Sequence, residues 1–190
     1  GLDPAEYVRP FPEGPPIFFH LGSMDWLPNQ EGIRWLLRSV WPRVVQAHPD
    51  ARLHLAGNRM PKDMIRARLP GTTVTGRVPD AIGYMADRHV MLVPLFSAGG
   101  MRVKIIEGMA MGKCVISTPV GAEGIHCTDG ENILFADSAA AFAETIDRVI
   151  ADPPFAARIG ENGRLLVERE HTNAHTIHEL VALYSSLLPA

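Results

Sequence analysis

Three charged side chains follow a pair of glycines in the middle of the chain. The glycines are Gly99 and Gly100, and the charged residues are Arg102, Lys104 and Glu107. Glycines let the backbone approach a ligand closely, and the free N–H groups and dipole at the start of a helix favour an anion. Two cations at that end of a helix are unfavourable unless an anion binds there. The spacing therefore predicts a phosphate site, with the glutamate one turn further along and able to reach a group beyond the phosphate.

Apolar runs on both sides of this stretch predict the strands that position it, at 89–95 and 114–117. A strand, a glycine turn, a helix and a second strand make up a phosphate-binding βαβ unit. Similar patterns along the chain predict strands at 17–21, 52–56, 73–75 and 133–135, and helices at 28–47, 61–69, 81–87, 138–151, 154–168 and 173–188. Pro42 should kink or break the first of these helices.

The alternation of strands and helices predicts an α/β fold. We expect a Rossmann-like, mostly parallel sheet of about six strands with helices on both faces and right-handed crossovers. Ligands of such sheets bind at the carboxyl ends of the strands. The loops at Gly22, Gly76, Gly99 and Gly121 all follow predicted strands, so we expect them to meet in one crevice.

Composition narrows the class of protein. The chain has 190 residues, 46% of them hydrophobic and 21% charged, with a net charge of −3. These values suit one globular domain and provide no basic surface for nucleic acid. The longest apolar run is too short to cross a bilayer, and the first residues do not resemble a signal peptide. Two cysteines cannot form a disulfide framework, which favours a reduced, cytoplasmic setting.

Residues 1–16 differ from the rest of the chain. They contain five prolines and show no hydrophobic periodicity, which predicts a linker that leads into the domain.

Three stretches resemble one family. The run from Gly100 to Ile125 resembles the donor-binding region of the group 1 glycosyltransferases, retaining enzymes of the GT-B fold and the family 4 type. Residues 22–29 resemble the loop after the first strand of the same domain, and residues 130–135 resemble the short strand after the donor loop. The resemblance extends over residues 17–188, in the same order.

The resemblance implies a division into domains. Residues 17–190 would form the C-terminal, sugar-nucleotide-binding domain of a two-domain enzyme, and residues 1–16 would be the linker from an N-terminal acceptor domain that this sequence lacks. Because the GT-B active site lies between two domains, the isolated domain is expected to be inactive.

The resemblance also implies roles for residues around the predicted phosphate site. Glu107 matches the second glutamate of the Glu-x7-Glu motif, which binds the ribose hydroxyls in the family. Gly100 and Met101 lie where backbone N–H groups meet the diphosphate. Residues of two other loops would join them, with Arg77 and Val78 at the nucleobase and Gly22 and Ser23 at the phosphates.

The chain departs from the family at two places. Gly99 replaces the first glutamate of the motif, which contacts the sugar in the family. The arginine and lysine usual after the first strand are also absent, and Ser23 stands in that loop. We hypothesise that Arg102 and Lys104 supply the missing charge from the other side of the phosphate, and we assign both, with Glu107, as catalytic residues.

A leaving nucleoside diphosphate needs fixed donors and cations. GT-B enzymes provide them without a bound metal, and the chain has no Asp-x-Asp segment, so we expect no metal site and no cofactor. The resemblance implies transfer of a hexose from a UDP- or GDP-sugar to a glycan or lipid-linked acceptor in polysaccharide biosynthesis. The enzyme would be cytoplasmic, and any contact with the membrane would be peripheral to its inner face. Two other interpretations stay open, half of a nucleotide-sugar 2-epimerase and a non-catalytic nucleotide-binding module.

Overall fold

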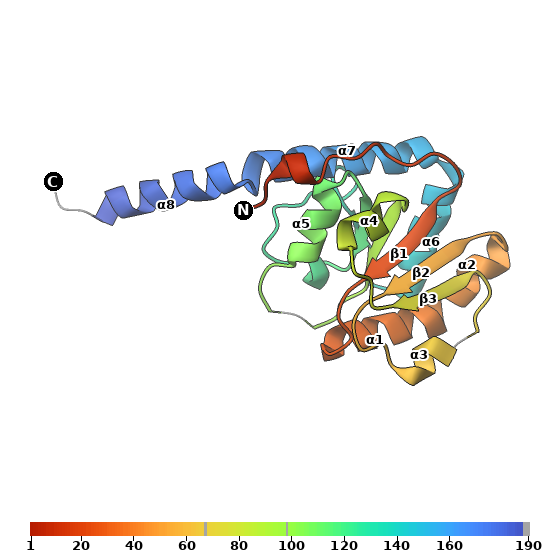
Figure 1. Ribbon diagram of the computed structural model, residues 1–190. Helices are drawn as coiled ribbons and strands as arrows, with labels where there is room; N and C mark the ends of the chain where they lie inside the picture. The colour runs from red at the N-terminus through yellow and green to blue at the C-terminus, as the bar shows by residue number, and fades with distance from the viewer. Residues whose placement is uncertain (67, 98, 188–190) are drawn as a thin grey trace.

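The computed structural model describes residues 1–66, 68–97 and 99–187 and shows a six-stranded sheet with helices on both faces (Figure 1). The strands are β1 (Ile17–Leu21), β2 (Arg52–Ala56), β3 (Thr72–Gly76), β4 (Val90–Val93), β5 (Cys114–Ser117) and β6 (Leu134–Phe135). They lie in the order β3-β2-β1-β4-β5-β6, and every neighbouring pair is parallel. The predicted α/β fold is thereby confirmed. The strand order reverses between β1 and β4, which is where ligands of such sheets bind.

The helices are η1 (Pro4–Glu6), α1 (Leu27–Trp35), η2 (Leu36–Val40), α2 (Trp41–Ala47), α3 (Lys62–Arg66), α4 (Ala81–Ala86), α5 (Val103–Ala110), η3 (Val120–Ala122), α6 (Ala139–Ala151), α7 (Pro153–Glu170) and α8 (Asn173–Leu187). Three positions of predicted elements lie outside the described residues. They are residue 67 in the predicted helix 61–69, residue 98 in the glycine stretch and residue 188 in the predicted helix 173–188. Among the residues that the structure describes, no helix is both long and apolar enough to cross a bilayer.

Two apolar clusters form the core, one on each face of the sheet. Phe18 belongs to the cluster that contains α1, α2 and α6, and Phe19 belongs to the cluster that contains α4 and α5. Successive side chains of a strand point to opposite faces, so β1 and β4, of which β4 is apolar throughout, supply both clusters.

The helix predicted over residues 28–47 is helical throughout but changes its hydrogen-bonding pattern. The segment η2 is a π-helix between α1 and α2, and Pro42 lies in the first turn of α2. Proline lacks a backbone N–H, and its ring would clash with the carbonyl of Arg38 in a continuous α-helix. The regular α-helical pattern therefore changes directly before Pro42, but the helix does not break there.

The segment before β1 is fixed to the domain at its start. The N–H of Leu2 donates to the carbonyl of His171 at 2.8 Å, and the N–H of Asn173 donates to the carbonyl of Leu2 at 3.0 Å. Figure 1 shows η1 beside the junction of α7 and α8. Tyr7, directly after η1, is 9% exposed and belongs to the apolar cluster of α5. The residues predicted to be a linker therefore begin against the domain and contribute to its core.

The last helix, α8, leads away from the sheet (Figure 1), and none of its fifteen residues is buried. Its large exposed apolar side chains are Ile177, Leu180, Val181, Leu183, Tyr184 and Leu187. Most of them recur at intervals of three or four residues, so they lie along one side of the helix.

Candidate functional site

A cavity of about 440 Å³ opens at the carboxyl edge of the sheet, beside β1. Gly22 after β1, Gly57 after β2 and Val78 after β3 line it, and the start of α5, after β4, closes another side. The cavity therefore lies at the switch point of the strand order, where the sequence predicted a crevice.

One loop predicted to join the crevice does not line it. A Cβ on Gly121 would lie 2.4 Å from the Ser117 hydroxyl oxygen and 3.1 Å from the Val93 carbonyl oxygen, so this turn packs directly against the ends of β5 and β4. A Cβ on Gly124 would lie 3.6 Å from the Cβ of Met101, which does line the cavity. The prediction for the loop at Gly121 was wrong because its backbone packs against the strand ends and leaves only an indirect contact with the cavity wall.

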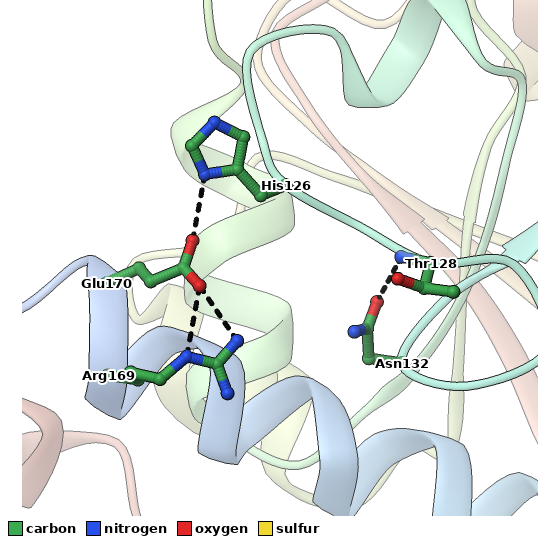
Figure 2. A network of polar contacts seen from close by, with 5 residues as sticks. All are labelled: His126, Thr128, Asn132, Arg169 and Glu170. Atoms are coloured by element: carbon green, nitrogen blue, oxygen red, sulfur yellow. Dashed lines mark hydrogen bonds and ion pairs between the residues drawn. The ribbon is translucent and has the colours of Figure 1, made fainter.

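Polar contacts hold the continuation of this loop (Figure 2). His126 Nδ1 lies 3.0 Å from Oε2 of Glu170 at the end of α7, and the other oxygen of Glu170 accepts two hydrogen bonds from the guanidinium of Arg169, at 2.8 and 3.0 Å. Further along, the N–H of Thr128 donates to the side-chain oxygen of Asn132 at 2.9 Å. The contact between His126 and Glu170 ties the loop to α7, and the hydrogen bond between Thr128 and Asn132 closes the loop on itself.

Lys104 reaches across the cavity to α1. Its ammonium donates to Oδ1 of Asn29 at 2.8 Å, and the Asn29 amide donates to the carbonyl of Ser23 at 2.8 Å. Burial, and to a lesser extent the charge of Arg102, lower the pKa of Lys104 from its usual 10.5 to about 7. The cation of α5 thus lies beside the loop after β1, where the sequence showed no basic residue.

Gly22 occupies the centre of this polar group. A Cβ on Gly22 would come 2.9 Å from Asn29 Nδ2, 3.0 Å from His20 Nε2 and 3.3 Å from Lys104 Nζ. Any side chain here would therefore displace one of these nitrogens. His20 is fully buried, its Nδ1 pairs with the carbonyl of Leu92 at 2.8 Å, and burial lowers its pKa well below the usual value, so its ring is neutral.

Arg102 holds the glycine turn in place. It is the N-cap residue of α5, and its guanidinium donates to the carbonyls of Gly99 and Gly100 and lies 4.8 Å from the centre of the Trp26 ring. Gly100 has a φ of +77°, which only glycine adopts without strain. Residues Met101 to Lys104 line the cavity, so the free N–H groups of the first helical turn lie at its edge.

Glu107 completes this wall one turn further along α5. The carboxylate is half-buried, and its Oε1 accepts a hydrogen bond of 3.5 Å from the hydroxyl of Tyr7. Burial raises the pKa of Glu107, and the contact with Tyr7 opposes that rise.

Seven of the residues assigned from the sequence line this one cavity: Gly22, Ser23, Val78, Met101, Arg102, Lys104 and Glu107. Gly99 and Gly100 form the exposed turn that Arg102 holds, and neither they nor the exposed Arg77 line the cavity. Sequence reasoning placed Asn29 at a helix start and at the end of the loop that resembles the family, but it did not predict the contact of Asn29 with Lys104. It also missed Tyr7, for which the predicted linker gives no signal. Within residues 1–66, 68–97 and 99–187, no group of three or more His, Cys, Asp or Glu side chains could hold a metal ion.

One family model and two curated proteins match this chain. The model of the family described as glycosyl transferases group 1 matches residues 15–152. The capsular polysaccharide biosynthesis glycosyltransferase CapM of Staphylococcus aureus is 25% identical over 179 residues, which are 90% of this chain and 47% of CapM. An uncharacterized 44.6 kDa protein of the Klebsiella pneumoniae cps region is 24% identical over 135 residues, which are 66% of this chain and 35% of that protein. The chain thus spans half or less of the length of these curated relatives.

Solved structures show the same fold. Anabaena HepE in complex with UDP superposes with a TM-score of 0.78 at 16% identity, over 98% of this chain and 56% of that one. The C-terminal domain of a glycosyl transferase group 1 family protein from Francisella tularensis superposes with a TM-score of 0.69 at 18% identity, over 91% of this chain and all of that one.

Proposed function

The chain belongs to the glycosyl transferases group 1 family, and from this membership we propose that it is the sugar-nucleotide-binding half of a retaining glycosyltransferase. The complete enzyme moves a hexose from a nucleoside-diphosphate sugar to a glycan or a lipid-linked acceptor. The observation that carries the proposal is the placement of Lys104, whose ammonium reaches from α5 to the loop after β1 and borders Gly22.

The cavity can accept each part of a nucleoside diphosphate. The pyrophosphate fits between Gly22 and the start of α5, where helix N–H groups and Lys104 provide donors and positive charge. Glu107 lies one turn beyond Lys104 on the same side of the helix, and a carboxylate accepts hydrogen bonds from two hydroxyls, which suits a ribose. Val78 and Ala81 line the part of the wall that follows β3, and we assign the nucleobase to this part, with Arg77 at its exposed edge.

The same groups assist departure of the diphosphate. Negative charge develops on the leaving oxygen as the glycosidic bond breaks, and donors that are already in place stabilise it most effectively. Lys104 and the first turn of α5 supply those donors, and Arg102 keeps the glycine turn in the shape that exposes them. We propose that no metal ion or other cofactor takes part.

The names of similar proteins support a choice of donor and pathway. HepE was solved with UDP and with UDP-glucose, and CapM is a glycosyltransferase of capsular polysaccharide biosynthesis. We therefore propose a UDP-sugar as donor, with a GDP-sugar as the other candidate, and a part in polysaccharide biosynthesis.

We further propose that residues 1–16 join this domain, residues 17–190, to an N-terminal acceptor domain. The exposed apolar side of α8 supports this assignment because a helix without packed neighbours fits the surface of a further domain. The isolated domain is then inactive in transfer. We place the enzyme in the cytoplasm, at most peripheral to the membrane, where free cysteines such as Cys114 and Cys127 stay reduced.

Calorimetric titration of the domain with UDP, GDP and ADP, with and without magnesium, tests the proposal. We expect one nucleotide to bind independently of the metal, and Glu107→Ala to abolish its binding. Glu144→Ala, on the exposed side of α6, is the matched control and should bind normally. Failure of both the domain and the full-length protein to bind any of the three would reject the proposal.

A second candidate is a nucleotide-binding module without chemistry, which Gly99 favours because it removes the glutamate that contacts the sugar in the family. Release of UDP from a UDP-sugar by the full-length protein would exclude this candidate.

A further inference from the structure

Tyr7 comes from the segment before the first strand, yet its hydroxyl reaches a carboxylate of the cavity wall. The hydroxyl donates to Oε1 of Glu107 at 3.5 Å across a sequence separation of 100 residues. Its ring is almost fully buried in the apolar cluster that also contains Ile106 of α5. Tyr7 does not line the cavity itself, whereas Glu107 does. Any influence of Tyr7 on a ligand must therefore act through Glu107.

We propose that Tyr7 is a positioning residue of the donor site, whose hydroxyl holds the Glu107 carboxylate in the orientation that receives the ribose hydroxyls. This inference rests on the proposed function, because it assumes that Glu107 contacts a ribose. It assigns to the interdomain segment a part in donor binding, in addition to that of a connection.

The chemistry of the carboxylate explains why such a partner matters. A glutamate side chain rotates about three bonds, and a hydrogen bond at one oxygen restricts that rotation. The second oxygen and the remaining lone pairs stay available to a ligand. Burial of Glu107 favours its protonated form, in which one oxygen becomes a donor, whereas the hydrogen bond from Tyr7 favours the ionised form that accepts from two hydroxyls.

The backbone sets the position of Tyr7. Leu2 forms backbone hydrogen bonds with His171, directly after α7, and with Asn173, the first residue of α8. Asp3 then caps η1 by accepting a hydrogen bond from the N–H of Ala5 at 3.1 Å, and the N–H of Tyr7 closes the same turn on the carbonyl of Pro4 at 3.0 Å. The segment is thus anchored directly before the residue that contacts Glu107.

The first test measures the carboxylate without any ligand. The Glu107 carboxyl carbon is titrated by NMR in protein labelled with ¹³C-glutamate, with its signal assigned from its absence in Glu107→Gln. Tyr7→Phe keeps the buried ring and removes only the hydroxyl, so we expect it to raise the pKa of Glu107. Tyr184→Phe removes a hydroxyl from exposed α8 and should leave that pKa unchanged. An unchanged pKa in Tyr7→Phe would overturn the inference whatever the protein binds.

The second test separates positioning from general damage. Calorimetry compares UDP with 2′,3′-dideoxy-UDP, which lacks both ribose hydroxyls. We expect Tyr7→Phe to weaken UDP binding about two- to tenfold, the loss typical of one hydrogen bond, and to leave dideoxy-UDP binding unchanged. The loss of UDP affinity caused by Tyr7→Phe should grow as the pH falls, because Glu107 takes up its proton at a higher pH in this variant than in the wild type.

The outcomes are distinguishable. Equal losses for the two nucleotides, or no loss for either, would overturn the positioning role while the proposed function stands. A wild-type domain and full-length protein that bind neither UDP nor GDP would reject the proposed function, and the ribose-positioning role with it. In that case the carboxyl titration still shows whether Tyr7 holds Glu107.

Discussion

Lys104 should take up a proton when a nucleoside diphosphate binds. In the free domain its pKa is about 7, so about half of the molecules carry the charge at pH 7. A diphosphate beside the amine favours the charged form and raises the pKa towards its usual value. Above pH 7, where the phosphates of the ligand no longer exchange protons, binding should then be accompanied by uptake of about 0.8 proton at pH 7.5 and about 0.9 at pH 8. Affinity accordingly falls as the pH rises above 7, by up to about tenfold per pH unit.

The neighbouring groups do not obscure this titration. His20 is neutral throughout the range because burial lowers its pKa well below the usual value. Burial raises the pKa of Glu107 from a usual value of 4.5. Arg102 stays charged at each of these pH values. Between pH 7.5 and pH 9, where the phosphates of UDP are fully ionised, the affinity should fall about 20-fold.

Calorimetry in two buffers with different ionisation enthalpies measures the number of protons taken up. Lys104→Met should bind UDP far more weakly and show no proton uptake, and Lys104→Ala should abolish binding. Lys62→Met, which removes an exposed lysine of α3, should behave as the wild type does. A wild type that binds UDP without proton uptake would refute the reasoning, and so would uptake that persists in Lys104→Met.

Three further substitutions test the surroundings of the site. Gly22→Ala places a Cβ 2.9 to 3.3 Å from three nitrogens, so the affinity for UDP, measured by calorimetry, should fall several-fold. The melting temperature of the variant should stay unchanged. Gly32→Ala would bring a Cβ to 1.8 Å from the Pro94 carbonyl oxygen and should lower the free energy of unfolding by about 1–3 kcal/mol in urea titrations. Gly99→Ala, with open space around it, is its control and should change stability little; an equal loss in both would contradict the packing argument. His126→Ala removes the contact between an exposed imidazole and Glu170 and should cost less than about 1 kcal/mol, and a larger loss in the same titration would show that this contact is stronger than its exposure implies.

Much of the sheet could be predicted from sequence because its inner strands β1, β4 and β5 are short, mainly apolar runs that end at turn residues. The run around Met91, for example, is apolar on both faces, which indicates a strand of a buried parallel sheet. The carboxyl-edge rule then predicted that the loops at Gly22, Gly76 and Gly99 meet in one crevice, and the resemblance to the family added Val78.

Contacts between side chains far apart in sequence could not be predicted in the same way. Lys104 and Asn29 are separated by 75 residues, and Tyr7 and Glu107 by 100. No periodicity links such residues, because their approach depends on how α1, α5 and the first segment pack on the sheet. The turn at Gly121 illustrates the same limit, since its position at the carboxyl edge was predictable but its packing against Ser117 was not.

The isolation of α8 has a consequence for the exchange of its amide hydrogens with solvent. A helix of fifteen residues without buried contacts is only marginally stable in water, so its amides should exchange with deuterium almost as fast as those of an unfolded peptide. The amides of α7, which packs on the core through residues such as Ile159, should exchange only on opening of the domain. Packing of α8 against another domain would slow its exchange, so the deuterium content of this helix tests the proposed contact between α8 and an N-terminal domain.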